Sequence, residues 1–242
     1  MLDIISITKD DPKGIARTIA STLPLRDRSG VRQFVVDSSC DSIREEVQTL
    51  CASQQDVRYA WSEPRGISCA FNEGIHLTSA RWLWFLNGGD EVHPDVDPDL
   101  LLSLLRLSTA DMLIFKLESH GVMSEHPAIQ DLWPPFVDWW VHHQAVILSR
   151  ELLVKVGGYR TDYKLLMDGD LWLRLFLRPT KADILSFPLG LVHDWGVSSN
   201  HRLRYREQTR MVLRHTFPLV RQWGRIGYRT VRDVYRSARR ST

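Results

Sequence analysis

Residues 81–91 read RWLWFLNGGDE, and the rest of the chain is organised around this stretch. The run from Trp82 to Leu86 is apolar, rich in aromatics and too short for most helices, so it predicts a strand buried on both faces. Asn87, two glycines and two acids follow at once, and glycine lets the backbone turn sharply and approach a ligand. Carboxylates just past the carboxyl end of a buried strand lie where open α/β sheets bind ligands. A solvated turn after a core strand explains the same residues, so the stretch alone leaves both interpretations open.

The pattern on either side of this stretch alternates between strands and helices. Apolar runs predict strands at 2–8, 33–37, 57–61, 82–86, 111–117, 142–148 and 184–192. Helical spacing predicts helices around 12–23, 41–50, 67–79, 95–107, 151–156 and 168–177. Such alternation predicts an α/β fold with a mostly parallel central sheet flanked by helices. Residues 119–138, rich in proline and ending near Trp139 and Trp140, are expected to form a long irregular loop of the kind that serves as a lid or binding loop.

Composition limits the class of protein. The 242 residues are 43% hydrophobic and 25% charged, as expected of a soluble globular protein. No apolar run approaches the ~18 residues of a membrane span, and the first residues have no features of a secretory signal. Cys40, Cys51 and Cys69 are odd in number and have no metal-site spacing, which predicts reduced thiols in a cytoplasmic protein.

The formal net charge of +2 hides an uneven distribution. After position 200 the chain has twelve arginines, no lysine and two acids, so this part carries +10 and the body carries −8. We therefore expect two parts, a globular domain over 1–200 and a basic helical extension over 201–242. As a helix, residues 218–240 would align arginines on one face and apolar residues on the other, a pattern typical of a helix in an anionic membrane interface. Packing of the apolar face on the domain is the alternative, and no motif for nucleic-acid binding is present.

Three acids occupy comparable places in the predicted fold. Asp37 closes the second strand, Asp90 follows the fourth, and Asp168 begins a helix. Strand ends in a parallel sheet share one edge, so Asp37 and Asp90 are expected to face the same crevice. Taken alone, Asp168 is most simply a helix N-cap.

Five motifs in order make the chain similar to a known family. They are ISIT at 5–8, VVDSSCD at 35–41, EPRGISCAFNEGI at 63–75, FLNGGDE at 85–91, and a block from HHQ at 142–144 through GGY at 157–159 to DGDLWLR at 168–174. Together they resemble inverting glycosyltransferases of family 2, which have the GT-A fold, and the resemblance covers roughly residues 4–200.

The resemblance implies a function and a set of site residues. It implies a catalytic domain that moves a sugar from a nucleotide-diphosphate sugar to a glycan or lipid-linked acceptor, in surface polysaccharide synthesis of a bacterial type. Asp168 falls on the position of the catalytic base, and Asp90 on that of the ligand for Mg²⁺ or Mn²⁺. Residues expected to contact the donor are Thr8, Asp37, Glu63, Arg65, Asn72 and Asn87.

Two departures from the family pattern affect these expectations. The usual first aspartate of the metal motif is absent, which leaves Asp90 as its carboxylate. An aspartate usual between Pro64 and Gly66 is missing too, which leaves Arg65 as a candidate contact for the diphosphate. His193 begins a segment that resembles a loop closing over the diphosphate and is a further candidate metal or phosphate contact, although a structural histidine explains it as well.

Other functions fit parts of the same pattern. A nucleotidyltransferase shares the sheet and the metal carboxylates, but it needs a glycine-rich phosphate loop after the first strand, and residues 8–12 contain no glycine. A non-catalytic module that binds nucleotide sugars is compatible with the missing aspartate. For the transferase, the basic extension predicts a peripheral protein on the inner face of the plasma membrane.

Overall fold

The computed structural model describes residues 1–124, 141–176, 178, 180–193, 202–211 and 213–215. The chain divides into two units, Met1–Ser199 and Asn200–Thr242, and each is considered by itself. In the second unit, residues 202–211 and 213–215 are helical, and the expected basic helix over 218–240 lies outside the described residues. Within the described part of the chain, no helix combines the length and apolarity needed to cross a bilayer.

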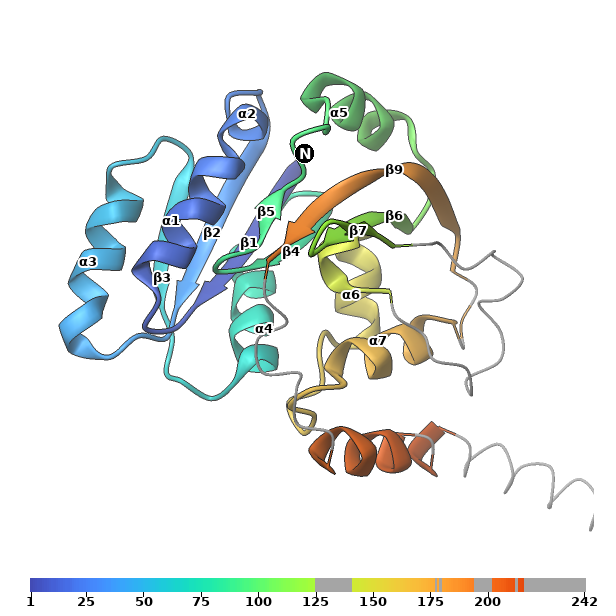
Figure 1. The fold of residues 1–242 in the computed structure, drawn as a ribbon. Coiled ribbons are helices and arrows are strands. Elements are labelled where there is room, and N and C mark those ends of the chain that lie inside the picture. Colours follow the sequence, from blue (N-terminus) through green and yellow to red (C-terminus); the bar gives the residue numbers. More distant parts are fainter. Residues whose placement is uncertain (125–140, 177, 179, 194–201, 212, 216–242) are drawn as a thin grey trace, which may run out of the picture. The chain divides into compact units, whose positions relative to one another are not determined.

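The first unit is built on one nine-stranded sheet (Figure 1). The strands are β1 (Leu2–Thr8), β2 (Val31–Asp37), β3 (Val57–Trp61), β4 (Trp82–Asn87), β5 (Glu91–Val92), β6 (Met112–Ser119), β7 (Val122–Met123), β8 (Val146–Ser149) and β9 (Ala182–Val192). Their order is β3-β2-β1-β4-β8-β6-β9-β5, and β7 pairs with β6. Strands β3, β2, β1 and β4 are mutually parallel, whereas β8 runs antiparallel to both β4 and β6. The mostly parallel sheet predicted from the sequence is thus confirmed, with one antiparallel strand in its middle.

Helices cover both faces of this sheet (Figure 1). They are α1 (Pro12–Ser21), α2 (Leu23–Arg26), α3 (Asp41–Ala52), α4 (Ile67–Leu77), α5 (Pro98–Leu107), α6 (Arg150–Val156) and α7 (Met167–Phe176), with a 3₁₀ turn, η2 (His143–Ala145). Asp11 caps α1 by accepting a 2.8 Å hydrogen bond from the Gly14 amide. Helices α1 and α3 pack on one face through residues such as Ile15 and Val47, and α4 packs on β1 and β2 from the other.

Some element boundaries differ from the prediction. The helix expected over 95–107 begins only at Pro98, because Asp97 caps it and proline suits the first turn. The strand expected over 142–148 begins at Val146, because the Gln144 carbonyl accepts a 2.9 Å hydrogen bond from the Trp84 indole and its segment forms η2. In the expected loop over 119–138, β7 folds back on β6. Residues 125–140, with the predicted aromatic lid, lie outside the described residues.

A buried aspartate fixes the start of β4. Asp3 is fully buried and accepts two 2.9 Å hydrogen bonds from the Arg32 guanidinium. Its Oδ2 also accepts the backbone amides of Ser79 and Ala80, at 3.0 and 2.9 Å. These two amides follow the end of α4, which therefore stops at Leu77 rather than at the expected residue 79. The carboxylate thereby sets how far β4 extends toward the carboxyl edge of the sheet.

Candidate functional site

The register of the parallel strands aligns three predicted site residues. Thr8 pairs with Asp37 across β1 and β2, and Ile7 pairs with Asn87 across β1 and β4. The ends of these strands therefore lie along one edge of the sheet. This is the edge at which open α/β sheets bind ligands.

The loop after β4 is shaped by glycine and held by one threonine. Gly89 has φ of 102°, a conformation that favours glycine. Its amide donates a 2.9 Å hydrogen bond to the Thr18 hydroxyl, whose oxygen lies 2.7 Å from the Asp90 carbonyl. Helix α1 thus fixes the turn that presents Asp90. Thr18 was not predicted as a site residue, since from the sequence it is one polar residue on an otherwise ordinary helix.

Asp90 is buried and its carboxylate is already oriented. Its Oδ2 accepts 2.9 Å hydrogen bonds from the Asn87 amide and from the Gln144 side chain. Burial raises the pKa of Asp90, although the nearby His143 and these hydrogen bonds lower it in part. A buried carboxylate whose ionised form is disfavoured in this way gains from a cation at the site.

Asp168 is joined through an imidazole to Asn87, the last residue of β4. His143 Nδ1 lies 2.8 Å from Asp168 Oδ2, and His143 Nε2 lies 3.3 Å from Asn87 Nδ2. Burial opposes protonation of His143, but the negative charges of Asp168 and Asp90 and the hydrogen bond to Asp168 outweigh it and raise the pKa of the imidazole. The candidate base and the candidate metal ligand thus belong to one polar cluster.

The second acid of the α7 motif has a different role. Asp170 is fully buried and forms ion pairs with Arg160 at 2.8 Å and Arg174 at 2.7 Å. Arg174 also donates to the carbonyl oxygens of Val156 and Gly158. Asp170 therefore anchors α7 to the segment before it, and Asp168 is left as the acid of this motif that faces the cluster.

Three buried oxygens of the cluster lack a hydrogen-bond partner in the described structure: Asn87 Oδ1, Gln144 Oε1 and Asp168 Oδ1. Buried polar atoms in proteins are nearly always paired, so unpaired oxygens gathered in one place point to a ligand that supplies hydroxyl groups or a cation. Gln144 was not predicted as a site residue. Its position as a polar side chain just before an apolar run was the available signal.

The donor set suits a hard cation that arrives with its substrate. Among the described residues, no group of three or more His, Cys, Asp or Glu side chains is arranged so that it could hold a metal ion. Mg²⁺ is usually bound by one or two carboxylates, with substrate phosphates and water completing its shell. One carboxylate from Asp90 is compatible with that mode of binding.

Asp37 occupies its predicted position, but its carboxylate is turned into the protein. It accepts hydrogen bonds from the Ser39 amide at 2.9 Å, from the Ser39 hydroxyl at 2.5 Å and from the Tyr59 hydroxyl at 3.0 Å. Burial, together with the bond to Asp37, raises the pKa of Tyr59. The carboxylate thereby stiffens the turn after β2 beside Thr8.

The other predicted residues are spread around this edge. Glu63 and Arg65 lie on the loop before α4, both largely exposed and 3.9 Å apart. The amide of Asn72 is engaged with the backbone of Tyr159, whose carbonyl accepts at 2.7 Å and whose amide donates at 2.8 Å. His193 lies 2.7 Å from Glu91, the neighbour of Asp90 in the chain. Glu91 was expected in the turn, but it begins β5 and pairs with β9.

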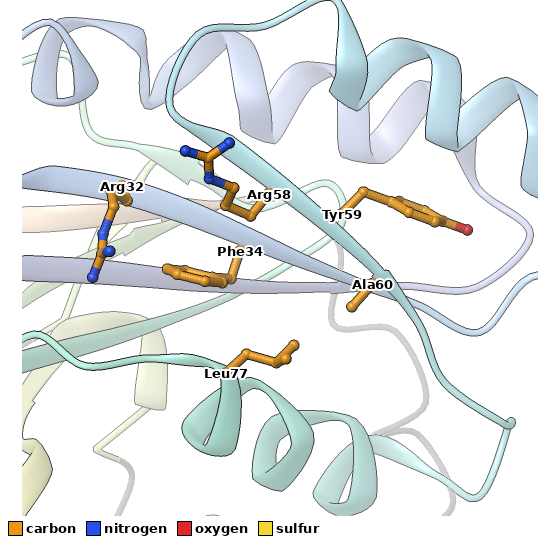
Figure 2. A pocket seen from close by; sticks show the side chains of 6 residues that line it. All are labelled: Arg32, Phe34, Arg58, Tyr59, Ala60 and Leu77. Atoms are coloured by element: carbon orange, nitrogen blue, oxygen red, sulfur yellow. The ribbon is translucent and has the colours of Figure 1, made fainter.

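A separate hollow of about 260 Å³ lies on the outer part of the sheet (Figure 2). Its lining residues come from β2, β3 and the end of α4: Arg32, Phe34, Arg58, Tyr59, Ala60 and Leu77. No residue predicted from the sequence as a site residue lines it. Arg32 is already paired with Asp3, so its charge is compensated.

Two solved structures illustrate the likeness of the fold. S. aureus TarS residues 1–349 in complex with UDP-GlcNAc matches with a TM-score of 0.66 and 13% identity, over 88% of this chain and 66% of that chain. The mannosyltransferase PcManGT from Pyrobaculum calidifontis, in complex with GDP-Man and Mn²⁺, matches with a TM-score of 0.60 and 17% identity, over 91% and 64% of the two chains. At these identities the likeness establishes the GT-A fold.

Sequence relatives come from mycobacteria. An uncharacterized glycosyltransferase of Mycobacterium tuberculosis is 26% identical over 186 residues, which are 73% of this chain and 69% of that protein. A PGL/p-HBAD biosynthesis glycosyltransferase of Mycobacterium bovis is 23% identical over 173 residues, which are 67% and 66% of the two proteins. Residues 3–156 match the sequence profile of glycosyl transferase family 2, and this match includes β1 to β4 and the loop that carries Asp90. The chain is a member of glycosyl transferase family 2.

Proposed function

We propose that the chain is an inverting glycosyltransferase that moves a sugar from a nucleotide-diphosphate sugar to a hydroxyl of its acceptor, with Asp168 as the base. The observation that carries the proposal is the line of contacts from Asp168 through His143 to Asn87. It ties the acid that opens α7 to the loop after β4. Base and donor sites must be adjacent for a direct displacement, because the acceptor oxygen attacks the carbon that the diphosphate leaves.

The donor lies along the carboxyl edge of the sheet in this proposal. Thr8, Asp37 and Asn87 border it in one row, and the exposed Arg65 supplies a positive charge to the diphosphate. Glu63 lies on the same loop, 3.9 Å from the Arg65 guanidinium. Asn72 contributes indirectly, because its amide is engaged with the Tyr159 backbone. The ligands of the solved relatives, UDP-GlcNAc and GDP-Man, support a nucleotide sugar as the donor class.

The chemistry requires one proton transfer and one displacement. Asp168 takes the proton of the acceptor hydroxyl as its oxygen bonds to the anomeric carbon. The bond from that carbon to the diphosphate oxygen breaks on the opposite side, so the configuration inverts. Asp90 would hold Mg²⁺ or Mn²⁺, which when bound neutralises charge on the leaving diphosphate. His193 reaches the same loop through Glu91 and is the second candidate contact for the ion or the phosphates.

The proposed acceptor is a glycan or a lipid-linked molecule of surface polysaccharide synthesis. One relative is named for PGL/p-HBAD biosynthesis, which supports an acceptor of the cell envelope. The arginines after position 200 favour docking on an anionic membrane through residues 218–240. Sedimentation with anionic liposomes tests this: the full chain is expected to sediment and a chain truncated after Phe217 to stay in solution. Equal behaviour of the two would refute the membrane role.

Asp168→Asn tests the proposed reaction. Transfer or hydrolysis of UDP- and GDP-sugars with Mn²⁺ is expected to fall by about 10²–10⁴-fold, the contribution of a general base. Donor affinity in calorimetry is expected to stay within about threefold. Asp183→Asn, an exposed aspartate of β9, is the matched control and should keep wild-type turnover. Donor binding without turnover by the wild type would instead identify a non-catalytic module.

A further inference from the structure

We propose that His143 is the positioning residue of Asp168: it selects which carboxylate oxygen receives the acceptor proton. The inference rests on the proposed function. It assigns a role to a histidine that takes no direct part in the proposed proton transfer or displacement. Its basis is the geometry around η2, where one imidazole contacts both Asp168 and the loop after β4.

The imidazole is fixed from several sides. It packs against the Phe71 ring edge to face, with centroids 5.2 Å apart and planes at 70°. Phe71 in turn packs against Phe85 of β4 and Tyr159. Because His143 precedes β8, the pairing of β8 with β4 also holds its backbone beside the loop that carries Asp90. A ring held in this way presents its nitrogens in fixed directions.

Exposure assigns the two partners different roles. The Asp168 side chain is 23% exposed, whereas that of His143 is 8% exposed. Solvent therefore reaches the Asp168 side chain rather than the imidazole, while Asp168 Oδ1 itself is buried and unpaired in the described part of the chain. His143 acts through Asp168 rather than on the substrate.

The hydrogen bonds leave one carboxylate oxygen available. With the proton on Nδ1, His143 donates to Asp168 Oδ2, and its Nε2 accepts from the Asn87 side chain. Asp168 Oδ1 is then the oxygen without a partner in the described part of the chain. The acceptor proton goes to Oδ1, while Oδ2 stays bonded to the imidazole throughout.

The groups that influence Asp168 come from three elements. His143 faces it from η2, Asp90 acts on His143 from the loop after β4, and the buried Tyr159 precedes α7. The imidazole N–H donates to an ionised carboxylate, and such charge-assisted hydrogen bonds are short and directional, so it holds the Asp168 carboxylate in one orientation. Loss of this donor frees the carboxylate to turn, which is expected to lower kcat rather than donor affinity.

Two amide substitutions separate the two imidazole nitrogens. In His143→Asn the amide N–H₂ stands close to where Nδ1 lies, and in His143→Gln it stands close to Nε2. We expect His143→Gln and His143→Leu to lower kcat by about 10–100-fold with donor KM within about threefold, since losses of supporting hydrogen bonds are of this size. His143→Asn should recover most of that loss. His76→Asn and His76→Gln, on the exposed end of α4, are the matched controls.

Two readouts distinguish positioning from a purely structural role. In His143→Gln the loss is expected in kcat and not in donor KM, and in His143→Asn kcat is expected to stay near its wild-type value. In ¹⁵N spectra of the wild-type imidazole, Nδ1 should carry the proton, and Asp168→Asn should alter that signal. This second readout does not depend on the leucine variant folding.

The failures of the two proposals look different. If the wild type turns over no nucleotide sugar, or if Asp168→Asn keeps the wild-type rate, the proposed function fails. If the wild type is active and Asp168→Asn is not, but His143→Gln keeps wild-type kcat, the role of His143 is refuted. Equal losses in His143→Asn and His143→Leu would refute it too.

Discussion

Asn72→Ala distinguishes a contact with the donor from a contact within the fold. The side-chain amide of Asn72 makes two reciprocal hydrogen bonds with the backbone of Tyr159, at 2.7 and 2.8 Å. Alanine removes both and leaves a donor and an acceptor of the buried Tyr159 without partners. Each buried group that is left without a hydrogen-bond partner costs about 1–3 kcal/mol of stability. We therefore expect a loss of about 3 kcal/mol, or about 6–12 °C in Tm for a unit of this size.

The assay combines equilibrium unfolding with donor binding. Urea midpoints and Tm report the stability, and calorimetry with a nucleotide sugar below the unfolding range reports the affinity of the folded fraction. His76→Ala, exposed on the same helix, should leave both quantities unchanged. Asn72→Ala should lose stability and keep donor affinity within about threefold. A variant with unchanged Tm and an affinity weakened tenfold would refute the reasoning and make Asn72 a donor ligand.

Three further predictions concern buried groups. Burial raises the pKa of folded Asp90, so its ionised form costs stability above the unfolded pKa, and this cost falls as pH drops through the folded pKa. Asp90→Asn should thus raise Tm at pH 7.5 in the absence of metal, and the increase should be smaller toward pH 4. Only the wild type should gain Tm from Mn²⁺ added with a nucleoside diphosphate. A Tm of Asp90→Asn below that of the wild type at pH 7.5 would contradict this. Gly74→Ala places a Cβ 2.3 Å from Cγ2 of Ile5 and should cost about 1–3 kcal/mol in urea unfolding; an unshifted midpoint would show that β1 yields freely. Asp3→Ala leaves the Arg32 pair broken and the Ala80 amide without an acceptor, so it should cost about 3–5 kcal/mol by the same measurement, and a cost below about 1 kcal/mol would argue against an anchoring role.

The fold was predictable where one apolar run defines an element. Strands β1 and β3 begin and end where the sequence predicts, since Leu2–Thr8 and Val57–Trp61 are short apolar or aromatic runs bounded by polar turns. The antiparallel direction of β8 could not be predicted. Periodicity indicates which face of a strand is buried, but it does not indicate which strands lie beside it. Strand β5 has only two residues, and its partner β9 lies about a hundred residues later, so no local pattern indicated it.

The candidate site was predictable as a set of residues and not as a set of contacts. Asp90 and Asp168 belong to motifs that the sequence displays directly. Their connection through His143 depends on η2 and on the rotation of α7, neither of which periodicity specifies. Asn72 illustrates the same limit, because its partner Tyr159 lies far along the chain and offers only backbone atoms.

The ion pairs of Asp170 also bear on how the chain can change in length. Residues two apart on an α-helix point about 200° apart around its axis, so the side chains of Asp168 and Asp170 lie on different sides of α7. The ion pairs of Asp170 with Arg160 and Arg174 hold α7 in one rotation about its axis. They lie on the side of the helix away from Asp168. An insertion at the exposed residues 161–162, before the buried Tyr163, can then be absorbed as a change of loop without turning the Asp168 carboxylate away. This short segment is where new sequence, natural or engineered, can enter next to the chemistry at the smallest cost to it.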